Sequence, residues 1–260
     1  LQQIAQGVDL TIFGGHMVEG CMPVIAKAGT EWNGIESFIG ESVAVNPSYF
    51  AFTGAVMDLG YDNPLDVVDW KVYSSYDDAL VAVQNGEVKY ALMGTQNNYG
   101  VKQLVDSGDI EIVSYQSEIM ENYSCCRMVG QTKWINDNPD TVKAIIRALL
   151  RAQSWYEANK EEAVSLHAKR IGQEDDYVAA YMMDDKHYFV NVDPLKNSVV
   201  RAWNILDKTG YLGDDCKIDI EDHINTELYE EALAEATKSY GDEAPDFYEA
   251  QQKFFDENDK

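Results

Sequence analysis

The feature that most constrains the fold is the alternation of short apolar segments with segments of helical periodicity between residues 10 and 115. Helices are predicted from Asn46-Pro47 to Leu59, over 77–84 and near 98–105, because capping residues precede them and Gly or Asn-Gly follows most of them. Apolar runs with the length of buried strands lie at 10–13, 22–26, 41–45, 70–73, 90–93 and 110–113. This alternation predicts βαβ units, mainly parallel sheets and the α/β class.

From Lys133 onward, the pattern changes to consecutive helices. Asn138-Pro139 begins a helix with one apolar face, formed by Val142, Ile145, Ile146, Leu149 and Leu150. Further helices are predicted at 160–171, at 174–186 and from Asp193-Pro194 to Gly210. Because the segments on both sides of the αβ run need a common core, we expect the chain to leave one lobe and later return to it.

Charge and composition exclude several classes of function. The chain has 45 acidic and 20 basic residues and a net charge of −25, which argues against binding to nucleic acid or to an anionic membrane surface. Its longest apolar stretches fall far short of the roughly 20 residues that a membrane helix needs. Cys21, Cys125, Cys126 and Cys216 match no zinc-binding spacing, so no metal or cofactor is expected. Residues 1–7 lack the features of an export signal, which we expect to be removed or outside this sequence.

The segments, taken in order, resemble the sulfonate/nitrate/taurine and thiamine-pyrimidine class of type 2 periplasmic binding proteins. The likeness covers nearly the whole chain, and the similar segments are Leu10–Gly15, Met22–Lys27, Ile39–Val45, Asp78–Ala91, Trp134–Ala144 and Ile218–Leu233. The resemblance implies a two-lobed fold, with lobe II at residues 30–125 and lobe I at residues 1–29 and 126–260. Family members begin with two further βαβ-like units, at ~30 residues each, so lobe I is expected to be incomplete here and to end in a helical segment.

The resemblance also implies a function. The chain is expected to be the extracytoplasmic solute-binding component of an ABC uptake transporter, with a small polar or anionic organic ligand in a cleft between the lobes. Its partners would be that ligand and an ABC permease, and it would be a monomer unless the missing part forces pairing. It would lie in the periplasm or outside the cell, held by a lipid anchor on a segment outside this sequence.

Two candidate binding segments lie in the expected lobe II. Asn46, Ser48 and Tyr49 follow a strand at a predicted helix start, where backbone N–H groups favour an anion or a carboxylate. Thr95, Gln96 and Asn97 follow the next buried strand and offer neutral donors and acceptors. Ordinary helix capping and a surface turn are the alternative interpretations of these two segments.

Two further candidate segments lie where the chain is expected to cross between lobes. The first contains Gly15, His16, Glu19 and Cys21, where glycine allows close backbone approach and His16 titrates near neutral pH. The second contains Tyr123, Cys125 and Arg127, with Arg127 as a possible bidentate clamp for an anion. A flexible loop at His16 and a structural ion pair at Arg127 are equally compatible with the sequence.

Other functions have less support. A Cys-His dyad drawn from Cys125 and His16 lacks the third group and the oxyanion pocket that a nucleophile needs, so an enzyme is not expected. One alternative is an enzyme like the fungal thiamine-pyrimidine synthases, which carry a cysteine-rich segment that is faintly similar to Ser124-Cys125-Cys126 here. The other is a ligand-sensing domain on the same fold. Sulfonate, nitrate, taurine and a thiamine pyrimidine precursor all remain open as ligands. Tyr49, Tyr99 and Tyr123 favour an organic molecule that can stack.

Overall fold

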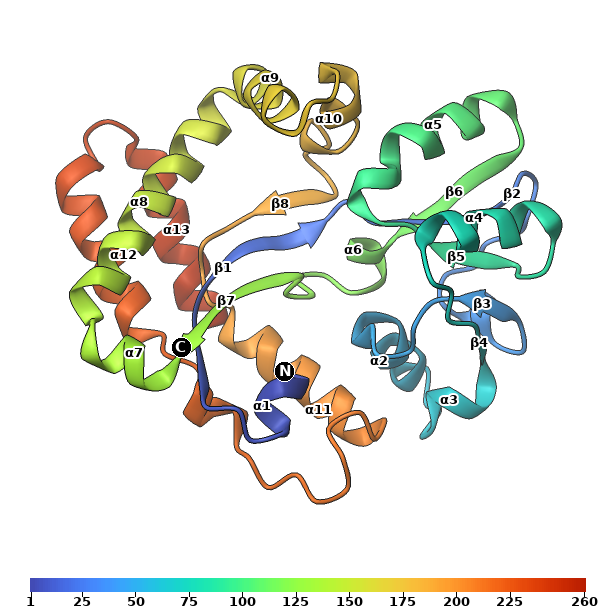
Figure 1. Cartoon of the computed structure of the whole chain (residues 1–260), viewed down its shortest axis with the longest axis horizontal. Helices are drawn as coiled ribbons and strands as arrows, with labels where there is room; N and C mark the ends of the chain where they lie inside the picture. Colours follow the sequence, from blue (N-terminus) through green and yellow to red (C-terminus); the bar gives the residue numbers. More distant parts are fainter. The chain divides into compact units, whose positions relative to one another are not determined.

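A computed structural model describes all 260 residues of the chain, which form two compact units (Figure 1). Unit 1 consists of Leu1–Val18, Ser124–Lys160 and Val190–Lys260, and unit 2 consists of Glu19–Tyr123 and Glu161–Phe189. The chain therefore passes from one unit to the other four times. The division differs from the expected lobes in three places: residues 19–29 and 161–189 belong to unit 2, and residues 124–125 belong to unit 1.

Unit 2 is built around a five-stranded sheet in the order β4-β3-β5-β2-β6. The strands are β2 (Pro23–Lys27), β3 (Ser42–Ala44), β4 (Asp69–Trp70), β5 (Tyr90–Leu92) and β6 (Ile110–Tyr115). β3 runs parallel to β4 and β5, whereas β2 runs antiparallel to both β5 and β6. The prediction of a mainly parallel sheet is therefore wrong for β2, which lies between β5 and β6 and runs in the opposite direction to both.

Residues 19–123 of unit 2 contain helices at the three segments where the sequence predicts them, together with two short helices that it does not predict. They are α2 (Phe50–Asp58), α3 (Pro64–Val67), α4 (Tyr76–Asn85), α5 (Asn98–Ser107) and α6 (Gln116–Ile119), with short 3₁₀ turns at Glu36–Phe38 and Thr95–Asn97. The Ser75 hydroxyl accepts from the Asp78 N–H at the start of α4, and Gly86 ends it in the left-handed conformation at φ 78°. Local capping chemistry thus fixes both ends of α4.

The start of α2 corrects one prediction. Asn46 and Pro47 do not begin the helix, which starts at Phe50. Instead, the Asn46 side chain accepts from the Ser48 N–H at 3.0 Å, and its carbonyl accepts from the Tyr49 N–H at 2.8 Å. Asn46 therefore closes a tight turn, a conformation that Asn favours as readily as a helix cap.

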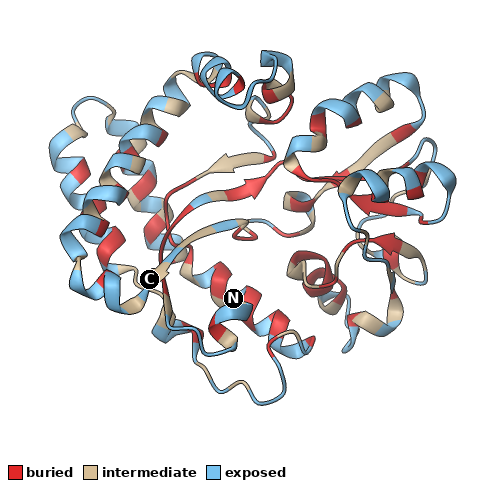
Figure 2. Ribbon diagram, in the orientation of Figure 1, coloured by how far each residue is buried: buried red, intermediate tan, exposed pale blue.

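Aromatic side chains fill the core beneath α2. Phe38 and Phe52 stack with ring centroids 5.9 Å apart, and Phe38 also contacts Trp32, Trp70 and Tyr90. Phe38, Phe52 and Tyr90 are fully buried. Figure 2 shows the neighbouring strands β2 and β5 in red, in agreement with their buried residues. This cluster supports the loops that follow β3 and β4.

Residues 161–189 join unit 2 through specific polar and aromatic contacts. The segment contains most of α9 (Lys160–Ile171), all of α10 (Asp175–Met182) and the start of β8 (Tyr188–Val190). Its His187 ring stacks on Tyr115 at 3.6 Å between centroids and lies within hydrogen-bond distance of Asp184 and Glu118. The Lys102 ammonium donates to the Ala180 carbonyl at 2.7 Å. The spacing of apolar residues along a helix does not predict these contacts with residues far away in the sequence.

Unit 1 is mainly helical. Its helices are α1 (Gln2–Ala5), α7 (Thr132–Asp137), α8 (Pro139–Ala158), α11 (Lys196–Lys208), α12 (Glu227–Tyr240) and α13 (Pro245–Asn258), with a 3₁₀ turn at Ile220–His223. A three-stranded sheet in the order β7-β1-β8 includes β1 (Leu10–Gly20) and β7 (Cys126–Gln131), which run antiparallel. No helix of the chain combines the length and hydrophobicity that crossing a bilayer requires.

The predicted apolar face of α8 is largely confirmed. Val142, Ile146 and Leu150 are completely buried in the unit 1 core, where α8 packs along α12. Leu149 packs partly against this core, whereas Ile145 is 39% exposed. The buried set has strict four-residue spacing, as expected for one narrow stripe of a helix.

A pair of buried carboxyl groups ties the end of α13 to the start of α11. The Asp193 side chain accepts from the Leu195 N–H at 2.7 Å, and the Asp259 side chain accepts from the Lys196 N–H at 2.9 Å. The remaining Oδ2 atom of each is buried without a donor, although the two carboxyl groups are close enough to hydrogen-bond. Burial, followed by the neighbouring acid, raises the pKa of Asp193, and burial raises the pKa of Asp259, so the pair retains a proton.

This pair predicts that stability falls as pH rises. The folded protein holds the shared proton above the ordinary carboxyl range, whereas the unfolded chain releases it near pH 4, so the contribution is fully present at acidic pH and is lost as the pair ionises. Asp259→Asn supplies a permanent donor to Asp193. We expect the free energy of unfolding of this variant to be about 1–2 kcal/mol higher than that of the parent at pH 8. At pH 4 the two free energies should differ little.

The measurement is urea unfolding across this pH range. Asp256→Asn is the matched control, because Asp256 lies in the last turn of α13, beside the C-cap residue Asp259, but is solvent-accessible and ion-paired with Lys260 at 2.7 Å. An equal pH dependence in the Asp259→Asn variant and the parent would contradict the shared proton.

Candidate functional site

Three loops gather at one edge of the unit 2 sheet because β3, β4 and β5 are parallel. Their carboxyl ends lead into residues 45–49, 71–75 and 93–97, respectively. In α/β sheets this edge is where loops and helix N-termini bind ligands. The strand arrangement therefore places the candidate site before any side chain is considered.

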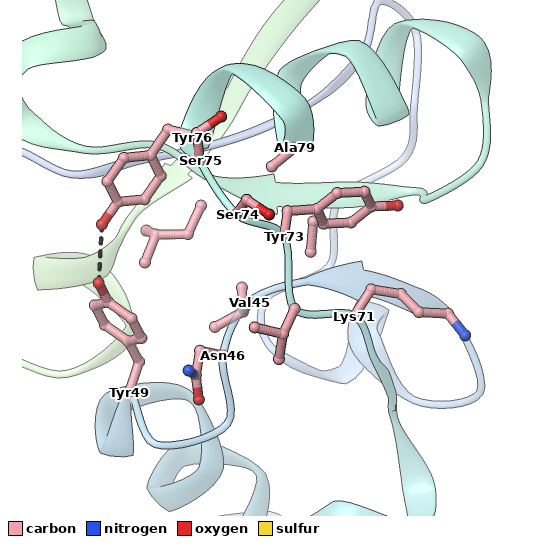
Figure 3. Close-up of a pocket in the computed structure, with 12 residues that line it drawn as sticks. Val45, Asn46, Tyr49, Lys71, Tyr73, Ser74, Ser75, Tyr76 and Ala79 are labelled. Carbon is pink, nitrogen blue, oxygen red and sulfur yellow. Dashed lines mark hydrogen bonds between the residues drawn. The ribbon is translucent and has the colours of Figure 1, made fainter.

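A pocket of about 220 Å³ opens between the first two of these loops. Its lining includes Asn46, Tyr49, Lys71, Ser74 and Tyr76. The hydroxyl groups of Tyr49 and Tyr76 hydrogen-bond at 2.9 Å, and Figure 3 shows this pair on one side while the Lys71 side chain extends away from it. The Lys71 ammonium pairs with Asp69 at 2.9 Å, and no carboxylate lines the pocket.

Sequence reasoning identified part of this pocket and missed the rest. Asn46 and Tyr49 line it, whereas Ser48 does not. The segment Lys71–Tyr76 was not singled out, although Ser75 lies between the short strand β4 and α4 and caps that helix. Residue 46 was selected because it is a small polar residue between a strand and a helix. The same rule applied after β4 would have found this segment as well.

The loop after β5 is held by buried hydrogen bonds. The Asn98 side chain donates to the carbonyls of Cys21 at 2.7 Å and Thr95 at 2.8 Å, and Thr95 itself donates to the Gly20 carbonyl. Gln96 and Asn97 line a separate groove. The three predicted residues Thr95, Gln96 and Asn97 are therefore not brought together with Asn46 and Tyr49 in one pocket.

Glu19, Cys21 and Tyr123 are buried in unit 2 and are occupied by internal contacts. The Glu19 carboxylate accepts from the Asn122 N–H at 2.9 Å, and the Tyr123 hydroxyl accepts from the Gly20 N–H at 2.6 Å. The Cys21 thiol lies 3.7 Å from Asn98 Oδ1 and from Asp184 Oδ2. Burial, and then the Asp184 charge, raise the pKa of this thiol to about 12, so it stays protonated at neutral pH and is a poor nucleophile.

Gly15 and Arg127 form a tight backbone contact in unit 1. The Arg127 guanidinium donates to the Asp193 carbonyl and, at 2.8 Å, to the Met17 carbonyl. Burial lowers the pKa of Arg127 to about 10, which leaves it charged at neutral pH. A Cβ atom at Gly15 would lie 2.5 Å from the Asp193 carbonyl oxygen. His16 is exposed, and its carbonyl accepts from the Asn191 N–H at 3.1 Å.

Cys125 and Cys126 are adjacent thiols at the start of β7, and neither forms a disulfide. Their sulfur atoms are 3.8 Å apart, and Cys126 is exposed. The contact with Cys125, and more weakly the Arg127 charge, lower the pKa of Cys126 to about 6. Cys216 is also free, and no group of three or more His, Cys, Asp or Glu side chains is arranged to hold a metal ion.

Comparison with solved structures gives the class of fold. The chain is similar to the periplasmic aliphatic sulphonate binding protein SsuA from Escherichia coli, with a TM-score of 0.65 and 15% identity over 86% of this chain and 71% of that one. It is also similar to the periplasmic nitrate-binding protein NrtA from Synechocystis PCC 6803, with a TM-score of 0.61 and 15% identity over 90% and 72%. The desulfurization enzyme DSZB matches with a TM-score of 0.58 and 14% identity over 88% and 80%. The chain thus has the α/β fold of type 2 periplasmic binding proteins.

A comparison at the level of sequence families is consistent with this fold. Residues 1–163 match the NMT1/THI5-like family, and the chain belongs to this family. No curated protein matches the chain. The resemblance stated from the sequence is confirmed by the family match and by the solved structures.

Proposed function

We propose that the chain is the solute-binding component of an ABC uptake system and that it takes up its ligand at the pocket beside Tyr49 and Tyr76. The observation that carries this proposal is the pocket's position at the carboxyl edge of parallel strands, with lining residues from two different loops. Among the similar solved structures are a sulphonate-binding and a nitrate-binding periplasmic protein, which supports a solute-binding function. The ligand is released unchanged, and an ABC permease is the partner that receives it.

The pocket favours a small polar or anionic organic ligand. Its volume of about 220 Å³ is below the ~300–1,000 Å³ of sites for drug-sized molecules. Hydroxyl and amide groups from Asn46, Ser74 and Tyr49 line it, and Lys71 is its one cationic residue. The periplasm or the cell exterior is the compartment that fits this role.

In this proposal the remaining predicted residues do not contact the ligand, because their side chains are engaged elsewhere or lie outside the pocket lining. The side chains of Glu19, Thr95 and Tyr123 are hydrogen-bonded to backbone groups, and Arg127 is hydrogen-bonded to two carbonyls. Burial raises the pKa of the Cys21 thiol, and a protonated thiol is a poor nucleophile, which argues against covalent catalysis at this residue.

A thermal-shift screen of sulfonates, taurine, nitrate and pyrimidines tests the proposal. A ligand at 100 times its dissociation constant adds about 2.7 kcal/mol to stability. For the compound that binds, we expect Tyr49→Phe to weaken affinity by about fivefold to tenfold in calorimetry, because a hydroxyl group that faces a desolvated polar ligand is lost.

Tyr61→Phe is the matched control, since Tyr61 is also partly exposed in unit 2 but lies outside the pocket. The control variant should bind as the parent does. Full affinity in the Tyr49→Phe variant would place the ligand elsewhere and overturn this assignment of the site.

A further inference from the structure

A second hollow in unit 2, which we call the tyrosine groove, lies between α4 and α5 and reaches α10. It has a volume of about 680 Å³. Its walls include the rings of Tyr76, Tyr99 and Tyr177, and the last two have centroids 6.0 Å apart at an interplanar angle of 52°. Leu80 and Leu104 add apolar surface. Tilted aromatic rings around an open volume provide π faces that attract cations.

The charge of the groove has one sign. Asp77 is its only lining residue with a formal charge. Lys102, the neighbouring cation on α5, directs its ammonium to the Ala180 carbonyl at 2.7 Å and is not part of the lining. Further carboxylates occupy the first turns of α4 and α10, at Asp78, Asp175 and Asp176. The local field therefore favours a positively charged guest.

Asn97 supplies an acceptor without a donor in the same wall. Its Nδ2 donates to Asp77 Oδ1 at 3.2 Å, whereas its Oδ1 is buried and has no hydrogen-bond partner. Buried acceptors are nearly always satisfied in folded proteins. A guest that carries N–H donors would satisfy this oxygen after a small rotation of the side chain and would meet the Asp77 carboxylate at the same point.

We propose that the tyrosine groove is a binding site for an organic primary ammonium ion with an apolar or aromatic arm. The ammonium group donates to Asp77 and Asn97, and the arm packs against Tyr99, Tyr177 and the leucines. The groove is distinct from the pocket beside Tyr49, which contains no carboxylate. The two sites share only Ser75 and Tyr76, so the inference does not depend on the proposed function.

Calorimetry with phenethylammonium chloride tests this site, with 2-phenylethanol as the neutral probe of similar shape. We expect the ammonium to bind at least about tenfold more tightly than the alcohol, since only the ammonium carries charge to Asp77 and to the rings. Asp77→Asn should weaken ammonium binding by about tenfold, and Tyr99→Leu by about fivefold.

Asp78→Asn is the matched control because it removes the same charge from the same helix turn outside the groove lining. It should change ammonium affinity by at most about twofold, as expected for a more distant, screened charge. Three results would overturn the site: equal affinity for the alcohol, equal effects of Asp77→Asn and Asp78→Asn, or no saturable binding of the ammonium in the millimolar range.

Discussion

Replacing Asn98 with Asp is expected to lower the free energy of unfolding by about 3–5 kcal/mol at pH 8. Asn98 is completely buried, and its amide nitrogen is the donor shared by the Cys21 and Thr95 carbonyls. The substitution keeps the volume but removes both donor hydrogens and introduces a negative charge beside two carbonyl oxygens. Buried acceptors lose their partner, and the new charge lies in a poorly solvated site.

The pH dependence makes this prediction specific. Burial raises the pKa of the introduced carboxyl group, so the neutral form, which regains one donor, is favoured as pH falls. Chemical unfolding should therefore show a smaller deficit at pH 4 than at pH 8. Asn33→Asp makes the same charge change at an exposed position of unit 2 and should stay within about 0.5 kcal/mol of the parent. A similarly small loss in the Asn98→Asp variant would show that this amide does not hold the loop after β5.

Gly15→Ala is expected to destabilise the protein by about 3 kcal/mol through steric overlap. The added methyl group would lie 2.5 Å from the Asp193 carbonyl oxygen and would also overlap the Arg127 guanidinium. That oxygen is held in place by Arg127, and the Gly15 N–H donates to the adjacent Val192 carbonyl at 2.6 Å. The backbone at this point has little freedom to move away.

Gly100→Ala provides the control for Gly15→Ala, since a Cβ atom there meets nothing within 4 Å. In the first turn of α5, alanine should be neutral or stabilising by about 0.5–1 kcal/mol. Thermal and urea unfolding of the two variants would measure the difference. Equal stability of both variants would contradict the close approach of Gly15 to Asp193.

The candidate site was only partly predictable from sequence, for a reason that Tyr49 and Tyr76 illustrate. Each residue lies near the start of a helix after a strand, a position that capping and periodicity rules identify separately. That their hydroxyl groups meet at 2.9 Å follows from the parallel pairing of β3 with β4, which brings residues 27 positions apart to one edge. Strand order in a sheet depends on long-range pairing, which local patterns do not encode.

Local sequence patterns were enough to predict the α/β class, the family resemblance, most strands, the end of α4 at Gly86 and the start of α8 at Pro139, because these depend on residues a few positions apart. The same patterns did not indicate that β2 runs antiparallel, that residues 161–189 pack in unit 2, or that Asp193 meets Asp259. Each of these depends on partners far apart in the chain. Asp193 shows the difference: in the sequence it precedes Pro194 as an ordinary helix start, whereas in the fold it is buried beside a second acid that holds its proton.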